Sequence, residues 1–441
     1  MGHGCARYLE SLAVPLPSPP PTAAPDIVTP IPGPRSRALG ERLREVESRN
    51  VTAMIPDVPI FWERAAGANV WDVDGNRYVD LGGAFGVAVA GHAHPHVVAA
   101  IARQSGTLLH AMGDVHPPAI KVELLERLCA LFPGGGPARG VLGSSGTDAV
   151  ETALKTAVIA TGHPGVVAFE GGYHGLGIGA LDATWRSDFR APFTARLADA
   201  TSFARFGDID DIARAADACP AAVGAVIVEP IQGRGGERVP PAGFLRELRA
   251  LCSNRGWLLI VDEVYTGFGR TGRIFACEHE GVVPDLLCVG KGLSSGMPIS
   301  ACLGTAAAMD AWPASTGEAL HTQTFLGHPA GCAAALASLE VLIEADLCSR
   351  AARVGAIALE ALRDSTAGIE AVHDVRGLGL MIGIECSDRD VAGRACTRAL
   401  ERGIITLPSG DGGRVLSVTP PLIIEEEALL SALATLVDCL R

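Results

Sequence analysis

Two side chains that could do chemistry, Lys291 and Asp262, each follow a short, continuously apolar segment of this sequence. Lys291 comes directly after DLLCVG (285–290), and Asp262 comes directly after WLLIV (257–261). Lysines are seldom buried unless they are used or paired, so a lysine at the end of a buried strand is unusual. Desolvation and positive neighbours lower the pKa of such an amine, which leaves it available as a nucleophile. Lys291 is therefore a candidate for forming a Schiff base.

Asp262 is the second candidate, because a carboxylate directly behind five apolar residues should be largely desolvated. Burying a charge is costly unless the charge has a partner. A backbone amide or an arginine could be that partner, or the carboxylate could bind a ring nitrogen and keep it protonated. Tyr173 lies in a loop after another apolar segment, GVVAF (165–169). Its ring could stack on a flat ligand, or it could be an ordinary core aromatic.

A short polar turn, GSSGTD (143–148), separates an apolar segment from the helical stretch AVETALKTAVIA. The free N–H groups and the positive dipole end at the start of a helix form an anion site. The hydroxyl groups of Ser145 and Thr147 could add hydrogen bonds to a phosphate. Serine, threonine and aspartate also cap helices for purely structural reasons, so both interpretations stay open at this point.

The elements that must position these residues are strands and helices that alternate through the middle of the chain. The apolar segments lie at 139–143, 165–169, 224–230, 257–264 and 285–290. Helical patterns such as GFLRELRALCSNRG (243–256) lie between several of them. Continuously apolar strands that alternate with helices predict a parallel sheet covered on both faces. Ligands collect at the carboxyl ends of the strands in such sheets, which is where the candidate residues lie.

The two ends of the chain predict a second, smaller domain. Residues 69–81 alternate apolar and polar around Asp74-Gly75, which indicates a hairpin. Residues 331–363 predict one long helix, 373–386 and 414–424 predict strands, and the C-terminal EEEALLSALATLVDCLR predicts an amphipathic helix. The expected fold class is α/β, with a mainly parallel, doubly wound sheet in a large domain and a smaller α+β domain.

The predicted organisation has four parts. They are a Pro-rich flexible tail at 1–34, the N-terminal part of the small domain at 35–95, the large domain at 96–330, and the C-terminal part of the small domain at 331–441. Proline fixes φ and removes a backbone donor, so the Pro-rich stretch 11–34 is expected to be extended or disordered. It could be a free tail or an arm on a partner subunit.

Together, the candidate residues supply the parts that a pyridoxal 5'-phosphate site needs: a phosphate-binding turn, a carboxylate for a ring nitrogen, a reactive lysine and a stacking aromatic. Lys291 would hold the cofactor as a Schiff base until an incoming amine displaces the lysine. Asp262 would keep the pyridine nitrogen protonated, so that negative charge formed at Cα can flow into the ring. The released Lys291 would then act as general base on the Cα proton.

Several motifs, in this order, resemble the class III, or ornithine/4-aminobutyrate-type, pyridoxal-phosphate-dependent aminotransferases, which have the type I transferase fold. The resemblance runs from about Arg64 to the C-terminus. It is carried by SSGTDAVETALK (144–155), GYHG (172–175), EPIQG (229–233), DEVYTGFGRTG (262–272), HTQTFLGHPAGCAAA (321–335) and the 29-residue step from Asp262 to Lys291.

The resemblance implies roles for individual residues. Cofactor-binding roles fall on Ser145, Gly146, Thr147, Tyr173, His174, Glu229, Asp262, Tyr265, Lys291 and Thr324. Tyr173 corresponds to the ring that stacks on the cofactor, and Glu229 to an acid near it. Thr324 corresponds to a hydroxyl that reaches the phosphate bound by the other subunit, which implies a homodimer. Phe85 falls in a segment that lines the substrate pocket of similar enzymes.

This sequence departs from the family pattern at the expected substrate carboxylate site. Many members continue EPIQG with a glutamate, which pairs with an arginine on a late strand that receives the substrate's α-carboxylate; here the two positions are Arg234 and Ser417. Arg414 is a poor substitute, because an odd step on a strand points to the opposite face. Arg234 could bind a substrate carboxylate itself, or be a surface arginine on a glycine loop. Tyr265 stands where glutamine is frequent, which indicates tuning of the cofactor's surroundings.

The predicted function is transamination, in which an amino group passes from an amino acid or amine to a 2-oxo acid. An amino-acid racemase or epimerase on the same scaffold is the alternative, and it would need a second acid on the opposite face of Cα. A binding protein without turnover is disfavoured because Lys291 and Asp262 are both present. A nicotinamide-dependent dehydrogenase is disfavoured because no G-x-G-x-x-G follows the first strand.

Composition narrows the partners further. The formal net charge of −13 disfavours nucleic acid and anionic membranes, and no apolar run reaches the length of a membrane span. The twelve cysteines are scattered, with no C-x-x-C and no zinc-finger spacing, so no metal site is expected. Scattered cysteines and the lack of a signal-peptide pattern predict a cytoplasmic enzyme.

Overall fold

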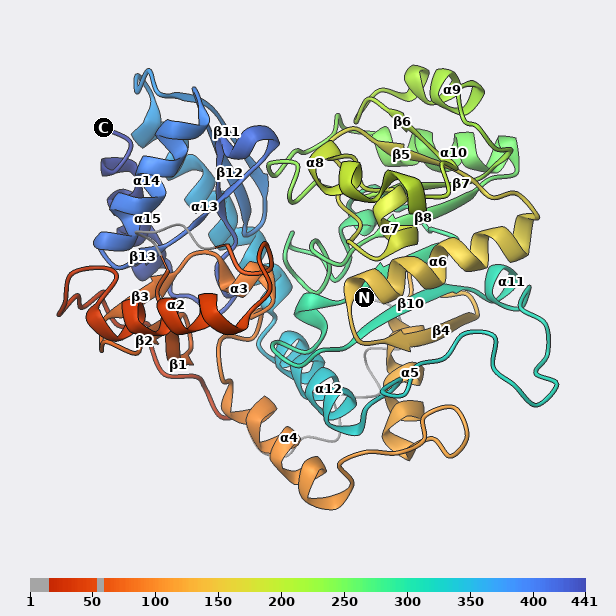
Figure 1. Ribbon diagram of the computed structural model, residues 1–441, viewed down its shortest axis with the longest axis horizontal. Helices are drawn as coiled ribbons and strands as arrows, with labels where there is room; N and C mark the ends of the chain where they lie inside the picture. Colours follow the sequence, from red (N-terminus) through yellow and green to blue (C-terminus); the bar gives the residue numbers. More distant parts are fainter. Residues whose placement is uncertain (1–15, 54–58) are drawn as a thin grey trace.

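The computed structural model describes residues 16–53 and 59–441, whose strands form three sheets. The largest sheet has seven strands in the order β4-β10-β9-β8-β7-β5-β6 and lies on the right of Figure 1. Its strands are β4 (Ala138–Gly143), β5 (Gly165–Phe169), β6 (Thr201–Ala204), β7 (Val223–Val228), β8 (Leu258–Asp262), β9 (Leu286–Val289) and β10 (Ser300–Thr305). The other two sheets have four strands each and come from the two ends of the chain.

The seven-stranded sheet is mainly parallel, which confirms the predicted fold class, with one exception. Strands β5 to β9 pair in parallel, whereas β10 is antiparallel to both β4 and β9. The sequence patterns do not predict β10 or β6. The β10 segment, SACLGT, consists mostly of small residues and lacks the β-branched run that marks the central strands.

The two faces of this sheet belong to separate hydrophobic clusters. In β8, Ile260 packs with residues of α6 (Gly146–Thr161), whereas its neighbour Val261 packs in the cluster that contains Leu248 of α10 (Phe244–Arg255). Helices therefore cover both faces of the sheet, which explains why its central strands are continuously apolar.

Ten helices have nine or more residues in the described part of the chain. They are α2 (Pro34–Val46), α4 (Pro95–Thr107), α5 (Ala119–Leu131), α6, α9 (Ile209–Asp217), α10, α12 (Pro329–Glu344), α13 (Leu347–Thr366), α14 (Arg389–Glu401) and α15 (Glu426–Asp438). Within the described ranges, no helix has the length and apolar character needed to cross a membrane.

The smaller sheets are built from both ends of the chain, on the left of Figure 1. Their orders are β1-β2-β3-β13 and β11-β12-β15-β14. The strands are β1 (Trp62–Ala66), β2 (Asn69–Asp72), β3 (Arg77–Asp80), β11 (Val372–Leu378), β12 (Met381–Cys386), β13 (Ile404–Ile405), β14 (Leu407–Ser409) and β15 (Val415–Val418). β2 and β3 are antiparallel on either side of Asp74-Gly75, which confirms the hairpin. β13 pairs in parallel with β3 and so joins the two ends.

Three predicted elements differ in detail. The single long helix expected at 331–363 is two helices, α12 and α13, because Asp346 adopts φ 44° between them and caps α13 by accepting the N–H of Ser349. The expected strand at 373–386 is the hairpin β11–β12. The strand expected at 414–424 ends at Val418, shortly before Pro420-Pro421.

The Pro-rich segment is described from residue 16 onward, and its first part, 1–15, lies outside the described residues. Residues 16–33 form no helix and only an isolated bridge, and they are hydrogen-bonded to the small domain. The N–H of Ala23 bonds to the Asn69 side chain at 2.7 Å, and Asp26 pairs with Arg77 in an isolated bridge. The described part of the expected flexible tail is therefore held in place. The predicted domain boundaries at 95/96 and 330/331 stay predictions.

Candidate active site

Lys291 begins a short 3₁₀ turn, Lys291–Leu293, immediately beyond β9. Its φ of 38° lies in the left-handed region, which non-glycine residues adopt rarely and which is found at many active sites. The ammonium nitrogen lies 4.0 Å from the centroid of the Tyr265 ring, and the described chain gives it no ion pair. Burial lowers the pKa of Lys291 to about 8, although the charges of Asp262 and Glu229 oppose the shift. A lysine with this pKa is partly neutral near pH 7, as a nucleophile must be.

Asp262 ends β8, the strand next to β9, so both candidate residues lie at the same edge of the sheet. Only 4% of Asp262 is exposed. One carboxylate oxygen lies 2.8 Å from Nδ1 of the buried His174, and the other accepts the N–H of Val264 at 3.1 Å. Burial alone would lower the pKa of His174, but the hydrogen bond and charge of Asp262, with the charge of Glu229, raise it above its ordinary value.

Glu229 follows β7 and holds two loops of the site together. Its carboxylate accepts the backbone N–H of Tyr173 at 3.0 Å and that of Gly233 at 3.1 Å. Burial raises the pKa of Glu229 to about 7, and the nearby Asp262 adds to the rise while His174 opposes it. The acid therefore ties the Tyr173 loop to the EPIQG loop beside Asp262.

Arg234 lies over aromatic rings at this edge. Its guanidinium carbon is 5.1 Å from the centroid of Tyr173 and 5.5 Å from that of Phe189, distances typical of cation–π contacts. Tyr173 and Phe189 themselves meet edge to face at 6.0 Å. The Arg234 side chain makes no hydrogen bond or ion pair with any residue in the described ranges. The Arg234 side chain thus lies beside Tyr173, and its positive charge is not neutralised by an acid in the described ranges.

The polar turn at 143–148 begins α6, with Ser145 as the N-cap. Asp148 accepts the backbone N–H groups of Ser144 and Ser145 at 2.9 and 3.0 Å, and its own N–H bonds to the Ser145 hydroxyl at 3.2 Å. A side chain at Gly146 would approach Val264 within 2.8 Å, so only glycine fits there. The start of this 16-residue helix can hold a phosphate by its backbone N–H groups and its dipole.

The Tyr265 ring, which lies against the Lys291 amine, fills the space between Gly86 and Gly233. Added Cβ atoms would lie 2.9 Å from its ring at Gly86 and 2.7 Å at Gly233. Its hydroxyl lies 3.2 Å from Oγ1 of Thr419. Burial raises the pKa of Tyr265, and the charge of Glu237 adds to the effect. The phenol therefore stays protonated and can donate a hydrogen bond.

Two predicted site residues have exposed side chains in the single chain. Thr324 is exposed and makes no hydrogen bond to a described residue. Phe85 is also exposed, and with Ala84 it adopts a left-handed conformation at φ 62° and 50°. The carboxylate of Asp80 holds this turn by accepting the N–H groups of Gly82, Gly83 and Ala84 at 2.8 to 3.0 Å.

Glu237 is a further residue near the site that the sequence does not predict; it is 1% exposed and accepts a hydrogen bond from Ser417, the residue in place of the family's late-strand arginine. Glu237 is not part of a recognisable sequence motif, so its proximity to the site is seen only in the folded structure. The Arg414 guanidinium pairs with Glu385 at 2.8 Å.

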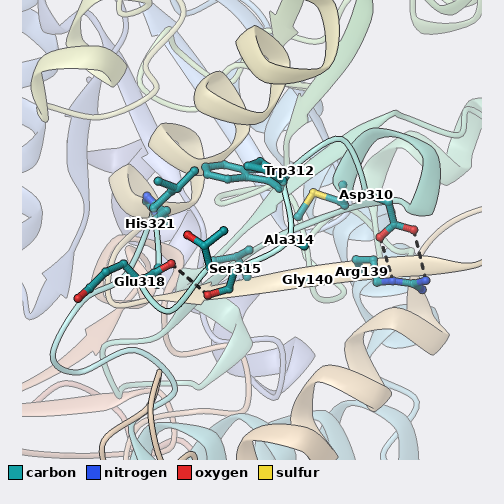
Figure 2. Close-up of a pocket in the computed structure, with 14 residues that line it drawn as sticks. Arg139, Gly140, Asp310, Trp312, Ala314, Ser315, Glu318 and His321 are labelled. Carbon is teal, nitrogen blue, oxygen red and sulfur yellow. Dashed lines mark hydrogen bonds and ion pairs between the residues drawn. The ribbon is translucent and has the colours of Figure 1, made fainter.

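A separate pocket of about 570 Å³ lies beside α6, between β4 and the segment that follows β10 (Figure 2). Arg139 pairs with Asp310 at 3.3 Å on one side of it, and Trp312 is bonded through its indole nitrogen to Thr156 of α6 at 2.9 Å. None of the predicted site residues lines this pocket. The candidate chemistry therefore lies at the strand ends and not in this cavity.

The residues at the strand ends fit pyridoxal phosphate. The start of α6 offers an anion site with no room for a side chain at Gly146, and Asp262 is a buried carboxylate that could bond a ring nitrogen. Lys291 is an amine with a lowered pKa and no paired acid among the described residues. The rings of Tyr173 and Tyr265 could supply aromatic walls for such a cofactor.

Known proteins give the family of this chain. A sequence profile of the family Aminotransferase class-III matches residues 51–440. The chain belongs to the class III aminotransferases. An acetylornithine aminotransferase from Methanopyrus kandleri is 41% identical, and the match covers 87% of this aminotransferase and 95% of the relative. A 4-aminobutyrate aminotransferase from Mycobacterium leprae is 37% identical, with 92% and 96% covered.

Solved structures agree with this assignment. The ornithine aminotransferase of Toxoplasma gondii ME49 superposes with a TM-score of 0.84 at 32% identity, covering 92% of this aminotransferase and 94% of that chain. A second structure of the Toxoplasma gondii enzyme has pyridoxal phosphate at partial occupancy in its active site. The aminotransferase is accordingly a pyridoxal-phosphate-dependent transaminase, and its substrates are an amino donor and a 2-oxo acid. The matches support transamination and do not support the racemase alternative.

Proposed function

We propose that Lys291 and Asp262 are the catalytic residues of this aminotransferase and that Arg234 binds a carboxylate group of its substrates. The observation that carries the proposal is the placement of Lys291 and Asp262 at the ends of neighbouring strands β9 and β8. One is an amine with a lowered pKa, and the other is a buried carboxylate oriented by His174.

Pyridoxal phosphate, when bound, supplies an electron sink that stabilises negative charge at the substrate Cα. Lys291 would anchor the cofactor covalently, and its free amine would accept the substrate Cα proton and return it to the product. Asp262 holds a proton on the ring nitrogen, and His174 keeps the Asp262 carboxylate in place. Ser145, Gly146 and Thr147 hold the phosphate.

Tyr173, Glu229 and Tyr265 position these groups. Tyr173 supplies an aromatic wall for the cofactor ring, and Glu229 fixes the Tyr173 backbone through the hydrogen bond at 3.0 Å. Tyr265 lies against Lys291, and its hydroxyl can donate a hydrogen bond to the bound ligand. Phe85 is assigned to the wall of the substrate pocket.

Replacing Arg234 by alanine tests the carboxylate-binding role. We expect the KM for 2-oxo acids to rise about 10- to 100-fold, because a hydrogen bond to a charged group contributes about 1.5–3 kcal/mol. The kcat should change much less, since the carboxylate lies away from the bonds that change. Steady-state kinetics with pyruvate and 2-oxoglutarate measure both constants. Arg238→Ala, just beyond this loop, is the matched control, and an unchanged KM for every acceptor in R234A would reject the role.

We also propose a homodimer in which Thr324 of each subunit reaches the phosphate site of the other. Large apolar side chains are exposed in two segments, 109–115 and 320–325, the second of which contains Thr324; they include Leu109, Met112, Val115, Leu320 and Phe325. The rings of His110 and Phe325 lie 5.2 Å apart, so these segments form one patch. Exposed apolar patches of this kind usually mark protein interfaces.

Light scattering on the purified enzyme tests the dimer, with an expected mass of twice the 45.5 kDa of the chain. Met112→Asp should shift this mass toward the monomer and weaken cofactor retention, because Thr324 is then lost from the partner's site. A monomeric wild-type enzyme that retains the cofactor would contradict the proposal. A cytoplasmic location is proposed as well, since every cysteine in the described ranges is a free thiol.

A further inference from the structure

The segment 233–237, here called the Arg234 loop, leaves the large domain after β7 and contacts the small-domain sheet that contains β12, β14 and β15. The carbonyl of Arg234 accepts the N–H of Gly410 at 3.0 Å. The carbonyl of Gly236 accepts two hydrogen bonds from the Arg376 guanidinium, at 2.9 and 2.6 Å. The backbone of the loop is therefore bonded to the other domain on both sides of Gly235.

Glu237 completes this contact with its side chain. Ser409 of β14 donates to one carboxylate oxygen at 2.7 Å, and Ser417 of β15 donates to the other at 2.6 Å. The approach is close, because a side chain at Gly383 of β12 would come within 3.0 Å of Glu237. Glu237 itself has φ 47°, so the loop keeps an unfavourable backbone conformation to make these bonds.

The chemistry of this carboxylate differs from that of an ordinary interface acid. Its two direct partners are hydroxyl groups, and the salt bridges in the described part of the chain do not include it. Burial raises the pKa of Glu237 to about 7, with the serine hydrogen bonds and the charge of Arg376 opposing the rise. A buried acid held by two hydroxyl groups is costly to keep, which suits a position with a functional role.

The loop lies between this contact and the active site. Arg234 stands three positions before Glu237, and its side chain points the opposite way, onto the rings of Tyr173 and Phe189. At its start, Gly233 is bonded to Glu229 at 3.1 Å. The Arg234 guanidinium is thus positioned by a short loop. One end of this loop is bonded to Glu229 beside the candidate active site, and the other end is bonded to the small domain.

We propose that Glu237 is a positioning residue for substrate recognition: it docks the Arg234 loop on the small-domain sheet and so holds the Arg234 guanidinium where a substrate carboxylate binds. The inference rests on the carboxylate-binding role proposed for Arg234. It makes the affinity for the carboxylate depend on the contact between the two domains, through a residue that does not touch the substrate.

A double-mutant cycle tests the inference, with the variants Glu237→Gln, Arg234→Ala and both together. Glutamine keeps the shape of the side chain but removes its charge and one acceptor. We expect E237Q to raise the KM for pyruvate, and the inhibition constant of the non-reacting carboxylate propionate, about tenfold each, because charge-assisted hydrogen bonds are the strong ones. The kcat should stay within about twofold. In the R234A background, E237Q should add nothing, since the group that it positions is gone.

The outcomes separate the two proposals. If R234A leaves both constants unchanged, the carboxylate role of Arg234 fails, and the inference fails with it. If R234A raises them but E237Q does not, or if the two effects simply multiply, only the inference is overturned. Ser409→Ala is the second variant, because it removes one donor to Glu237 and leaves the acid in place. It should give a smaller rise of the same constants, and this rise should also vanish in R234A.

Discussion

Replacing Lys291 by alanine is expected to lower turnover by roughly 10⁴-fold or more, since its acid–base role alone contributes about 10²–10⁴-fold. The change removes the covalent anchor of the cofactor and the base for the Cα proton together. The structure offers no substitute, because the sequence has only two other lysines, Lys121 and Lys155. Lys121 is bonded to the carbonyl of Gly113 at 2.7 Å, and Lys155 lies on the outer side of α6 beside His321.

Borohydride reduction followed by peptide mass spectrometry measures the anchor directly. The added mass of the cofactor should appear on the peptide that contains Lys291 in the wild-type enzyme, and no labelled peptide should appear in K291A. Lys155→Ala is the matched control and should label and turn over like wild type. Labelling of Lys121 or Lys155 in the wild-type protein would contradict the assignment.

Replacing Asp262 by asparagine should have the second largest effect, a fall in kcat of roughly 10²–10³-fold, similar to the loss of one preorganised electrostatic group in other active sites. Asparagine keeps the size of the side chain but cannot hold a proton on the ring nitrogen. The change also removes the partner that raises the pKa of His174. Burial then dominates, so His174 becomes neutral and the local charge arrangement is lost.

The measurement is kcat for a good amino donor, together with the affinity for pyridoxal phosphate and the absorption spectrum of the bound cofactor. The spectrum should shift in D262N even where the cofactor still binds, because the protonation state of its ring changes. Asp310→Asn is the control, since this exposed carboxylate pairs with Arg139 on the far side of α6. A D262N enzyme within tenfold of wild-type turnover and with an unchanged spectrum would reject the role.

The placement of Lys291 and Asp262 at the same edge of the sheet could be predicted from sequence because it depends on local rules. Each residue follows a buried strand, and the carboxyl ends of neighbouring parallel strands lie at one edge. The same reasoning predicts the helix N-terminus at Ser145. These features need no knowledge of how distant segments dock.

The contacts of Arg234 and Glu237 could not be predicted in this way. The stacking of Arg234 on Phe189 joins a loop to the short helix α8 (Ser187–Arg190), and the bond from Ser417 to Glu237 joins residues 180 positions apart in different domains. Strand β10 was also beyond prediction, since its small residues resemble a loop. The break between α12 and α13 depends on one residue, Asp346, whose left-handed backbone is invisible in the helical composition around it.

The joining of both chain ends in the small domain has a consequence for how the protein is made. The backbone N–H of Thr22 is bonded to the side chain of Glu425, 403 positions later. Strand β3 likewise pairs with β13, which comes from the other end of the chain. Contacts this distant in sequence form slowly, and a chain emerging from the ribosome cannot form them until β13 and Glu425 have been synthesised. The seven-stranded sheet needs nothing beyond β10 for its strands, so it can form first. Ser409 and Ser417, which bind Glu237, are synthesised only afterwards. The docking of the Arg234 loop, and with it substrate recognition at Arg234, is therefore expected to form late in the folding of the enzyme.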